Sequence, residues 1–149
     1  MLQELRKPHI HLGSFLLRLG LAGIFIVHGI LKFASQHGSA WHDDLTEASQ
    51  IAITWTELVC GFALFLGLLS RLAALGTIVI QVGAIVLETA HWGFIHIEYN
   101  RADPSRIPTG AEYNFALIMM ALAVIAIGSG KVSLDYFIFG SNEPTTPAR

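Results

Sequence analysis

The chain has 149 residues, of which 53% are hydrophobic and 13% are charged, and its mean hydropathy is +0.57. Because a soluble domain normally carries about a quarter charged residues, this composition excludes an ordinary water-soluble domain and predicts an integral membrane protein in contact with the lipid bilayer. The net charge of -2 excludes a broadly basic surface, so no nucleic-acid partner is expected.

The first apolar segment covers about residues 12–33 and follows a weakly basic start. It contains Arg18, His28 and Lys32, and it is longer than the apolar part of a secretory signal peptide. We therefore expect a retained transmembrane helix at this position.

Three further apolar segments follow, at about 51–69, 72–91 and 113–129. Each segment is near the roughly 20 residues that a helix needs to cross a bilayer. All are too long, and alternate too little, for barrel strands. The sequence predicts an all-α fold: residues 1–140 form a single antiparallel four-helix transmembrane bundle, and a loose tail covers 141–149. Only Ser70 and Arg71 separate the second and third segments, which predicts a tight hairpin there.

Basic residues beside the helix ends give the orientation, because they concentrate on the cytoplasmic side. The connection over 34–50 has no Lys or Arg. The bias therefore places both termini inside, and we expect the bacterial inner membrane. Arg18 and Arg71 would lie toward the inner side as structural or anchoring residues. The inner side would carry Arg6, Lys7, Arg71, Lys131 and Arg149, and the outer side Lys32, Arg101 and Arg106.

Ionisable side chains from all four helices gather in the outer half of this predicted bundle. A charge at the membrane centre costs about 2.5–3.5 kcal/mol, so we expect these groups to face the interior and to be paired. Structural explanations remain open, since Lys32 could extend to the lipid head groups and Glu57 could pair with it only to hold helices together. The set comprises His28, Lys32, Glu57, Glu88 and Glu112, with His91 close behind Glu88.

Histidine spacing does not favour a metal site. The pairs His37/His42 and His91/His96 are five residues apart, which on a helix separates the side chains by about 140°. No spacing matches zinc or Fe–S ligation. Haem would need two facing histidines inside the membrane, and only His28 is clearly inside, with His91 or His96 as the weaker second ligand. We therefore expect no metal and no cofactor within the chain.

Four features stand out in chain order: RLGLAGIFIVHGILKF (Arg18–Phe33), ELVCGFALFLGLLSRLAAL (Glu57–Leu75), Glu112, and GSGKVSLD (Gly128–Asp135). In this order they resemble the motifs of the DoxX family of small four-helix membrane proteins. The family is related to DoxD, the membrane subunit of a thiosulfate:quinone oxidoreductase, and other members resemble partners of redox proteins. The resemblance implies a four-helix fold and a quinone-linked role. The connection over 91–112 departs from the family in its length and its histidines, which indicates a specific partner or ligand.

These observations predict a membrane subunit of a redox or electron-transfer assembly with a quinone-type pocket at the outer end. His28 would donate a hydrogen bond to a quinone carbonyl, and Lys32 would offset carboxylate charge. Glu57 and Glu112 would relay protons, which is the catalytic role, because quinone reduction takes up protons. Glu88 and His91 would complete the ligand site. The expected protein partners are other membrane or outer-face subunits, or a second copy of the chain.

Two other functions remain open. In the first, the protein is a non-catalytic scaffold or assembly subunit in which the polar groups only lock the bundle. In the second, it is a small proton-coupled transporter, which is less favoured because the sequence has no visible inverted repeat.

Overall fold

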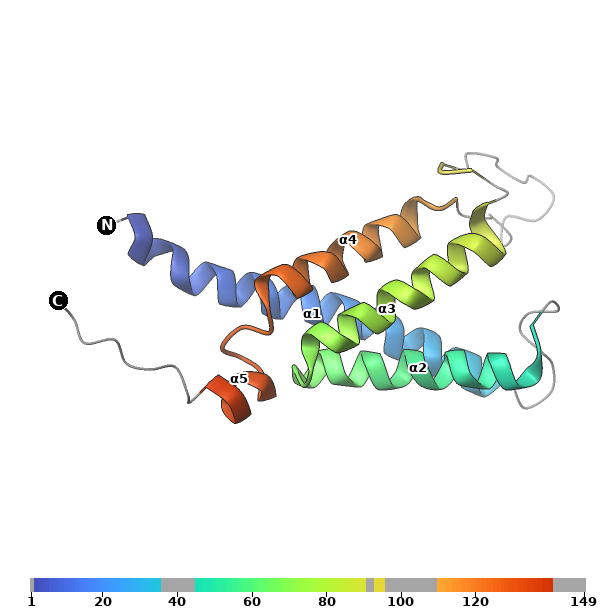
Figure 1. Cartoon of the computed structure of the whole chain (residues 1–149), viewed down its shortest axis with the longest axis horizontal. Helices are drawn as coiled ribbons and strands as arrows, with labels where there is room; N and C mark the ends of the chain where they lie inside the picture. Colours follow the sequence, from blue (N-terminus) through green and yellow to red (C-terminus); the bar gives the residue numbers. More distant parts are fainter. Residues whose placement is uncertain (1, 36–44, 91–92, 96–109, 141–149) are drawn as a thin grey trace.

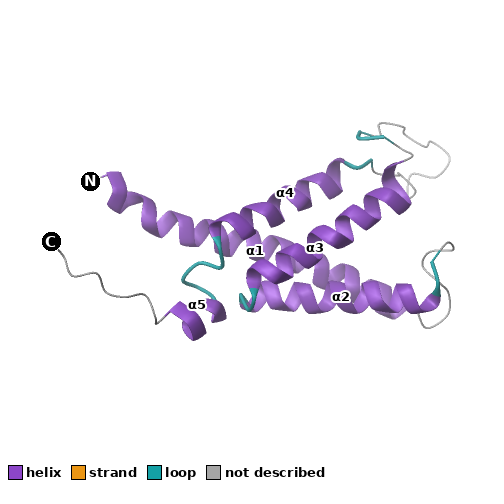
Figure 2. Ribbon diagram, viewed as in Figure 1, coloured by secondary structure: helices purple, strands orange, loops and turns teal. Residues whose placement is uncertain are grey.

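The computed structural model describes residues 2–35, 45–90, 93–95 and 110–140, and this part of the chain is helical with no strand (Figures 1 and 2). The prediction of an all-α fold is therefore confirmed for these residues. The elements are α1 (Leu2–Ser35), α2 (Glu47–Leu66), α3 (Ser70–Ala84), the π-helix η1 (Ile85–Thr89), α4 (Glu112–Ile127) and α5 (Leu134–Phe139).

Three of the described helical stretches are long and apolar enough to cross a membrane: Ile10–Ala34, Glu47–Leu66 and Ser70–Thr89. α4 is also apolar but has only 16 residues. Large apolar side chains on these helices are exposed, for example Val79 at 66% and Leu72 at 64%. An outer surface of this kind suits lipid and does not suit water.

The helix bounds differ from the apolar segments in two places. α1 begins at Leu2, ten residues before the apolar segment, although its first residues include Pro8, which disfavours a helix interior. Hydropathy marks only the part of the helix that is suited to lipid. The fourth segment also stops earlier than expected, because Gly128 follows α4 with a φ of 86°, a conformation that glycine adopts without strain.

The connection between α2 and α3 is short, as predicted, but it lies at residues 67–69 and not at Ser70 and Arg71. Gly67 has a φ of 70° and ends α2. Its N–H donates to the Leu64 carbonyl at 3.2 Å, while the Leu68 N–H donates to the Ala63 carbonyl at 2.8 Å. These two bonds form a Schellman motif, which needs a left-handed residue after the helix and therefore favours glycine.

One core joins the four long helices. α1 packs against α2 and α4, and α3 packs against the same two helices. The approach of α1 to α2 is close at Gly61, where an added Cβ would lie 2.8 Å from Ile26 Cγ1. Small residues permit this contact between membrane helices. The buried apolar side chains are Leu21, Ala22 and Phe25 on α1, Cys60 and Leu64 on α2, Ala73 and Ala74 on α3, and Leu117, Ala121 and Val124 on α4.

The structure has two distinct ends (Figure 1). At the first, which we call the α5 end, the turn between α2 and α3 lies beside α5. At the second, which we call the η1 end, the last turn of α1 lies beside the start of α2, and η1 lies beside the start of α4. The two ends differ in their polar chemistry.

Candidate functional site

Arg18 holds three segments together at the α5 end. Its side chain is 1% exposed. Nη1 donates to the Leu64 carbonyl at 2.9 Å, and Nη2 donates to the carbonyl of Val132. The guanidinium therefore ties α1 to the end of α2 and to the segment that leads into α5. The Ser14 hydroxyl adds a second tie, because it donates to the Gly128 carbonyl.

Asp135 completes this end by capping α3. Its carboxylate accepts hydrogen bonds from the backbone N–H groups of Leu69, at 2.6 Å, and Ser70, at 2.9 Å. Its own N–H donates to the Gly67 carbonyl at 2.9 Å. A carboxylate at a helix start satisfies free N–H groups and interacts favourably with the helix dipole. Arg71, in contrast, is exposed. The α5 end is a structural joint.

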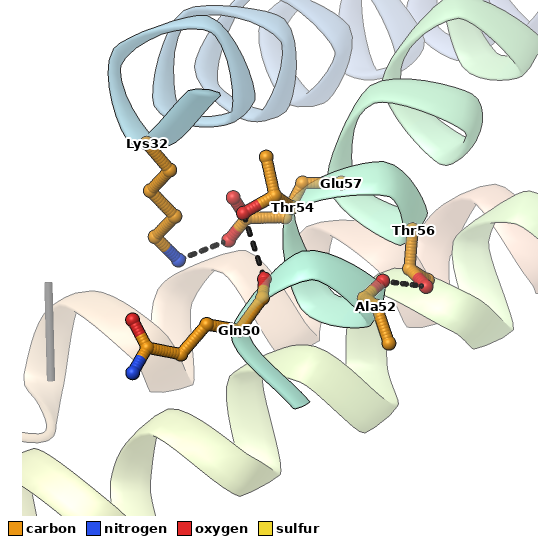
Figure 3. A network of polar contacts seen from close by, with 6 residues as sticks. All are labelled: Lys32, Gln50, Ala52, Thr54, Thr56 and Glu57. Carbon is orange, nitrogen blue, oxygen red and sulfur yellow. Dashed lines mark hydrogen bonds and ion pairs between the residues drawn. The ribbon is translucent and has the colours of Figure 1, made fainter. Parts of the chain in front are cut away.

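The η1 end contains an ion pair between helices. Lys32 Nζ of α1 lies 2.7 Å from Glu57 Oε1 of α2, and the two side chains are 23% and 4% exposed (Figure 3). The second carboxylate oxygen, Glu57 Oε2, is buried and has no hydrogen-bond partner among the described residues. A buried charged group with an unsatisfied oxygen is costly to keep, so this position needs an explanation.

Hydroxyl groups of α2 near this pair donate to its own backbone (Figure 3). Thr54 Oγ1 donates to the Gln50 carbonyl at 2.8 Å, and Thr56 Oγ1 donates to the Ala52 carbonyl at 2.7 Å. These bonds occupy the hydroxyl protons. The hydroxyl oxygens keep only acceptor capacity for other groups.

A cavity of about 570 Å³ lies at the η1 end, with the ion pair in its wall. Residues from α1, α2, α3, η1 and α4 line it, and most of its surface is apolar. Such a volume, with apolar walls and a few polar groups, is typical of small-molecule sites. The polar lining residues are His28, Lys32, Thr56, Glu57, Gln81, Glu88, Thr89, Tyr113 and Asn114.

The π-helix places two of these residues at the cavity. η1 contains Glu88, which is exposed, and Thr89, which is 8% exposed. Asn114 Nδ2 donates to Thr89 Oγ1 at 3.2 Å and thereby links α4 to η1. A π-turn changes the direction of side chains relative to a regular α-helix, and such turns are frequent at functional sites.

Four of the six residues predicted for the catalytic and ligand roles line this one cavity: His28, Lys32, Glu57 and Glu88. His28 is exposed. Glu112 is not in the wall, although Tyr113 and Asn114, which follow it, are. Its Oε2 is buried and has no partner within the described part of the chain. His91 lies outside the described residues.

Sequence reasoning did not select Thr89, Tyr113 or Asn114. Asn114 is 7% exposed at the start of an apolar helix, and a polar amide in such a helix could have marked it as a site residue. The sequence gives no such mark for Thr89, because threonine is common in membrane helices and its place at the cavity depends on the π-turn. Among the described residues, no three His, Cys, Asp or Glu side chains gather in a way that could hold a metal ion.

Comparison with known proteins identifies the family. The DoxX family model matches residues 13–92, which is more than half of the chain. The chain belongs to the DoxX family. Together with the apolar helices, this membership makes it an integral membrane protein. The match includes the residues of the Lys32–Glu57 pair and also Glu88, so most of the polar cavity wall lies in the part of the chain that carries the DoxX pattern.

One relative of this DoxX protein is a Bacillus subtilis (strain 168) protein named "Putative oxidoreductase CatD". It is 26% identical over 131 residues, which cover 86% of this chain and 88% of the relative. The similarity therefore extends over nearly the full length of both chains. No solved structure matches the chain at a significant level.

Proposed function

We propose that the protein is the membrane subunit of a redox assembly in the bacterial inner membrane, and that its cavity binds the head group of a quinone. In this proposal α1 to α4 form an antiparallel bundle that crosses the bilayer four times, with both termini inside. The η1 end then lies near the outer face.

One observation carries the proposal: an ion pair whose glutamate is buried, with one unsatisfied oxygen, lies in the wall of a mostly apolar cavity. An aromatic ring would fill the apolar space, and its polar substituents would meet the few polar groups. The site could exchange protons as well, because Glu57 and Glu88 are carboxylates and His28 is an imidazole.

Reduction of a quinone to its quinol consumes two electrons and two protons. The electrons would come from a partner subunit that carries a flavin or a haem. The present chain would bind the quinone and supply protons, with Glu57 and Glu112 as the relay and Lys32 as the countercharge. The name of the Bacillus relative, which describes an oxidoreductase, supports a redox role.

Binding of a soluble decyl-benzoquinone to the purified protein tests this proposal. We expect saturable binding that His28→Ala weakens, because His28 lines the cavity. His11→Ala is the matched control, since this histidine lies on the same helix outside the cavity wall, and binding should not change. Absence of saturable binding to the wild-type protein would refute the proposal. An equal loss in both variants would show that the cavity is not the site.

A second candidate function is a non-catalytic scaffold, and the Lys32–Glu57 contact favours it because the pair joins α1 to α2. Purification from native membranes in mild detergent separates the two functions. In a scaffold, Glu57→Gln would reduce the amount of partner that co-purifies and leave turnover per complex unchanged. In a quinone subunit, the same variant would lower turnover in complexes of normal composition.

A further inference from the structure

The carboxylate of Glu57 presents an unsatisfied hydrogen-bond acceptor in the cavity wall. We infer that the cavity binds the reduced, dihydroxy form of an aromatic head group in preference to the oxidised dicarbonyl form, because Glu57 holds an unsatisfied carboxylate oxygen in its wall. This inference rests on the proposed function and specifies which redox form the site favours.

Glu57 is the residue that sets this preference. Its side chain is 4% exposed, Oε1 accepts from Lys32 at 2.7 Å, and Oε2 has no partner among the described residues. An ionised carboxylate only accepts hydrogen bonds. The terminal torsion of a glutamate is broad, so a modest rotation can present either oxygen to a ligand. A phenolic O–H satisfies such an oxygen, whereas a quinone carbonyl is itself an acceptor and cannot.

The other polar groups at the cavity reinforce this bias. Thr56 donates its proton to the Ala52 carbonyl at 2.7 Å, and the Asn114 amide nitrogen donates to Thr89 at 3.2 Å. Each of these two side chains therefore keeps an oxygen that can accept. Glu88 adds a second carboxylate.

The remaining lining groups can adapt to either redox form. Lys32 is engaged with Glu57, while His28, Gln81, Thr89 and Tyr113 can each donate or accept a hydrogen bond. The charged lining residues are two glutamates and one lysine. A neutral ligand that brings its own O–H groups fits this arrangement better than one that brings only carbonyls.

The preference should be large enough to measure. A hydrogen bond to a charged group contributes a factor of about 10 to 100 in affinity. The diol should therefore bind at least about tenfold more tightly than the corresponding quinone. For a two-electron couple, a tenfold preference raises the midpoint potential of the bound quinone by about 30 mV.

The test compares three probes with the same decyl chain on the wild-type protein under anaerobic conditions: a hydroquinone, its quinone, and the hydroquinone dimethyl ether, which lacks donors and is redox-inert. Glu57→Gln is the test variant, because an amide both accepts and donates and should erase the diol preference while retaining binding. Glu47→Gln is the control, since Glu47 is exposed at the start of the same helix. Helix content and monodispersity show whether each variant is folded.

The inference is supported if the diol binds about tenfold or more tightly than both the quinone and the ether. The ratio of diol to quinone affinity should then fall to near one in Glu57→Gln and stay unchanged in Glu47→Gln. A quinone that binds as tightly as the diol overturns the inference and leaves the proposed quinone site standing. Failure of all three probes to bind overturns both. If Glu57→Gln is unfolded, the comparison of the three probes on the wild-type protein decides, and a diol-to-quinone affinity ratio near one overturns the inference.

Discussion

Removing the cation of the Lys32–Glu57 pair should destabilise the protein more than removing the carboxylate. Lys32→Met leaves a carboxylate that is 4% exposed without its countercharge, and the shorter glutamate side chain has less reach toward the surface. Glu57→Met leaves a lysine that is 23% exposed, and its long side chain can move the charge toward the surface.

The distance between the two charged atoms sets the scale. At 2.7 Å, and with an effective dielectric constant of about 20, Coulomb's law gives an attraction of about 6 kcal/mol before desolvation is counted. Desolvation of Glu57 offsets much of this attraction, and the partial exposure of Lys32 weakens it further. We expect a loss of about 2–3 kcal/mol in the free energy of unfolding for Lys32→Met, and about 1 kcal/mol for Glu57→Met. The double variant should lose about 1 kcal/mol.

A double-mutant cycle measures these values. Unfolding in mixed micelles, followed by helical circular dichroism across a denaturant titration, gives the free energy of unfolding of each variant, with exposed Lys131→Met as the control for loss of a lysine. The cycle should give a coupling energy of about 2–3 kcal/mol. A coupling below about 0.5 kcal/mol, or a greater loss in Glu57→Met than in Lys32→Met, would refute the reasoning.

Two further predictions concern the α5 end. Asp135→Ala removes the acceptor for the N–H groups of Leu69 and Ser70 and should lower stability by about 1–2 kcal/mol, seen as a lower Tm in detergent; an unchanged Tm would contradict the capping role. Gly67→Ala should prevent folding or strongly reduce the yield of monodisperse protein, because φ is +70° and an added Cβ would lie 2.5 Å from a guanidinium nitrogen. Gly83→Ala, where nothing lies within 4 Å, is the matched control and should be neutral.

Hydropathy located the helices well because the cost of placing polar backbone and charge in lipid acts on every residue of a span. It could not locate their ends, which depend on local backbone geometry. Gly67 and Leu69 both adopt positive φ and move the turn away from Ser70 and Arg71. Similarly, the polar composition of the first residues did not indicate that α1 begins at Leu2, before the apolar segment.

The candidate site was predictable to the extent that it depends on charge in an apolar helix. Opposite charges on neighbouring membrane helices favour pairing, which is why the Lys32–Glu57 contact was one of the arrangements that the sequence offered. The contributions of Thr89 and Asn114 could not be predicted, because they depend on the π-turn and on the register between η1 and α4. The sequence showed Asp135 only as part of the GSGKVSLD motif. Its capping of α3 could not be predicted, because its partners are backbone N–H groups that are distant in the sequence.

The most direct test of the quinone site is photoaffinity labelling with an azido-quinone, followed by mass-spectrometric mapping of the modified peptides. The account predicts that label falls on cavity-lining positions of α2 and α3, such as Ile53, Thr56 and Ile80, and that excess unmodified quinone competes it away. The contradictory result is label that is confined to the exposed apolar surface, for example at Phe62 or Leu72, and that the competitor does not reduce. Such label would mean that the quinone only dissolves in the surrounding lipid or detergent.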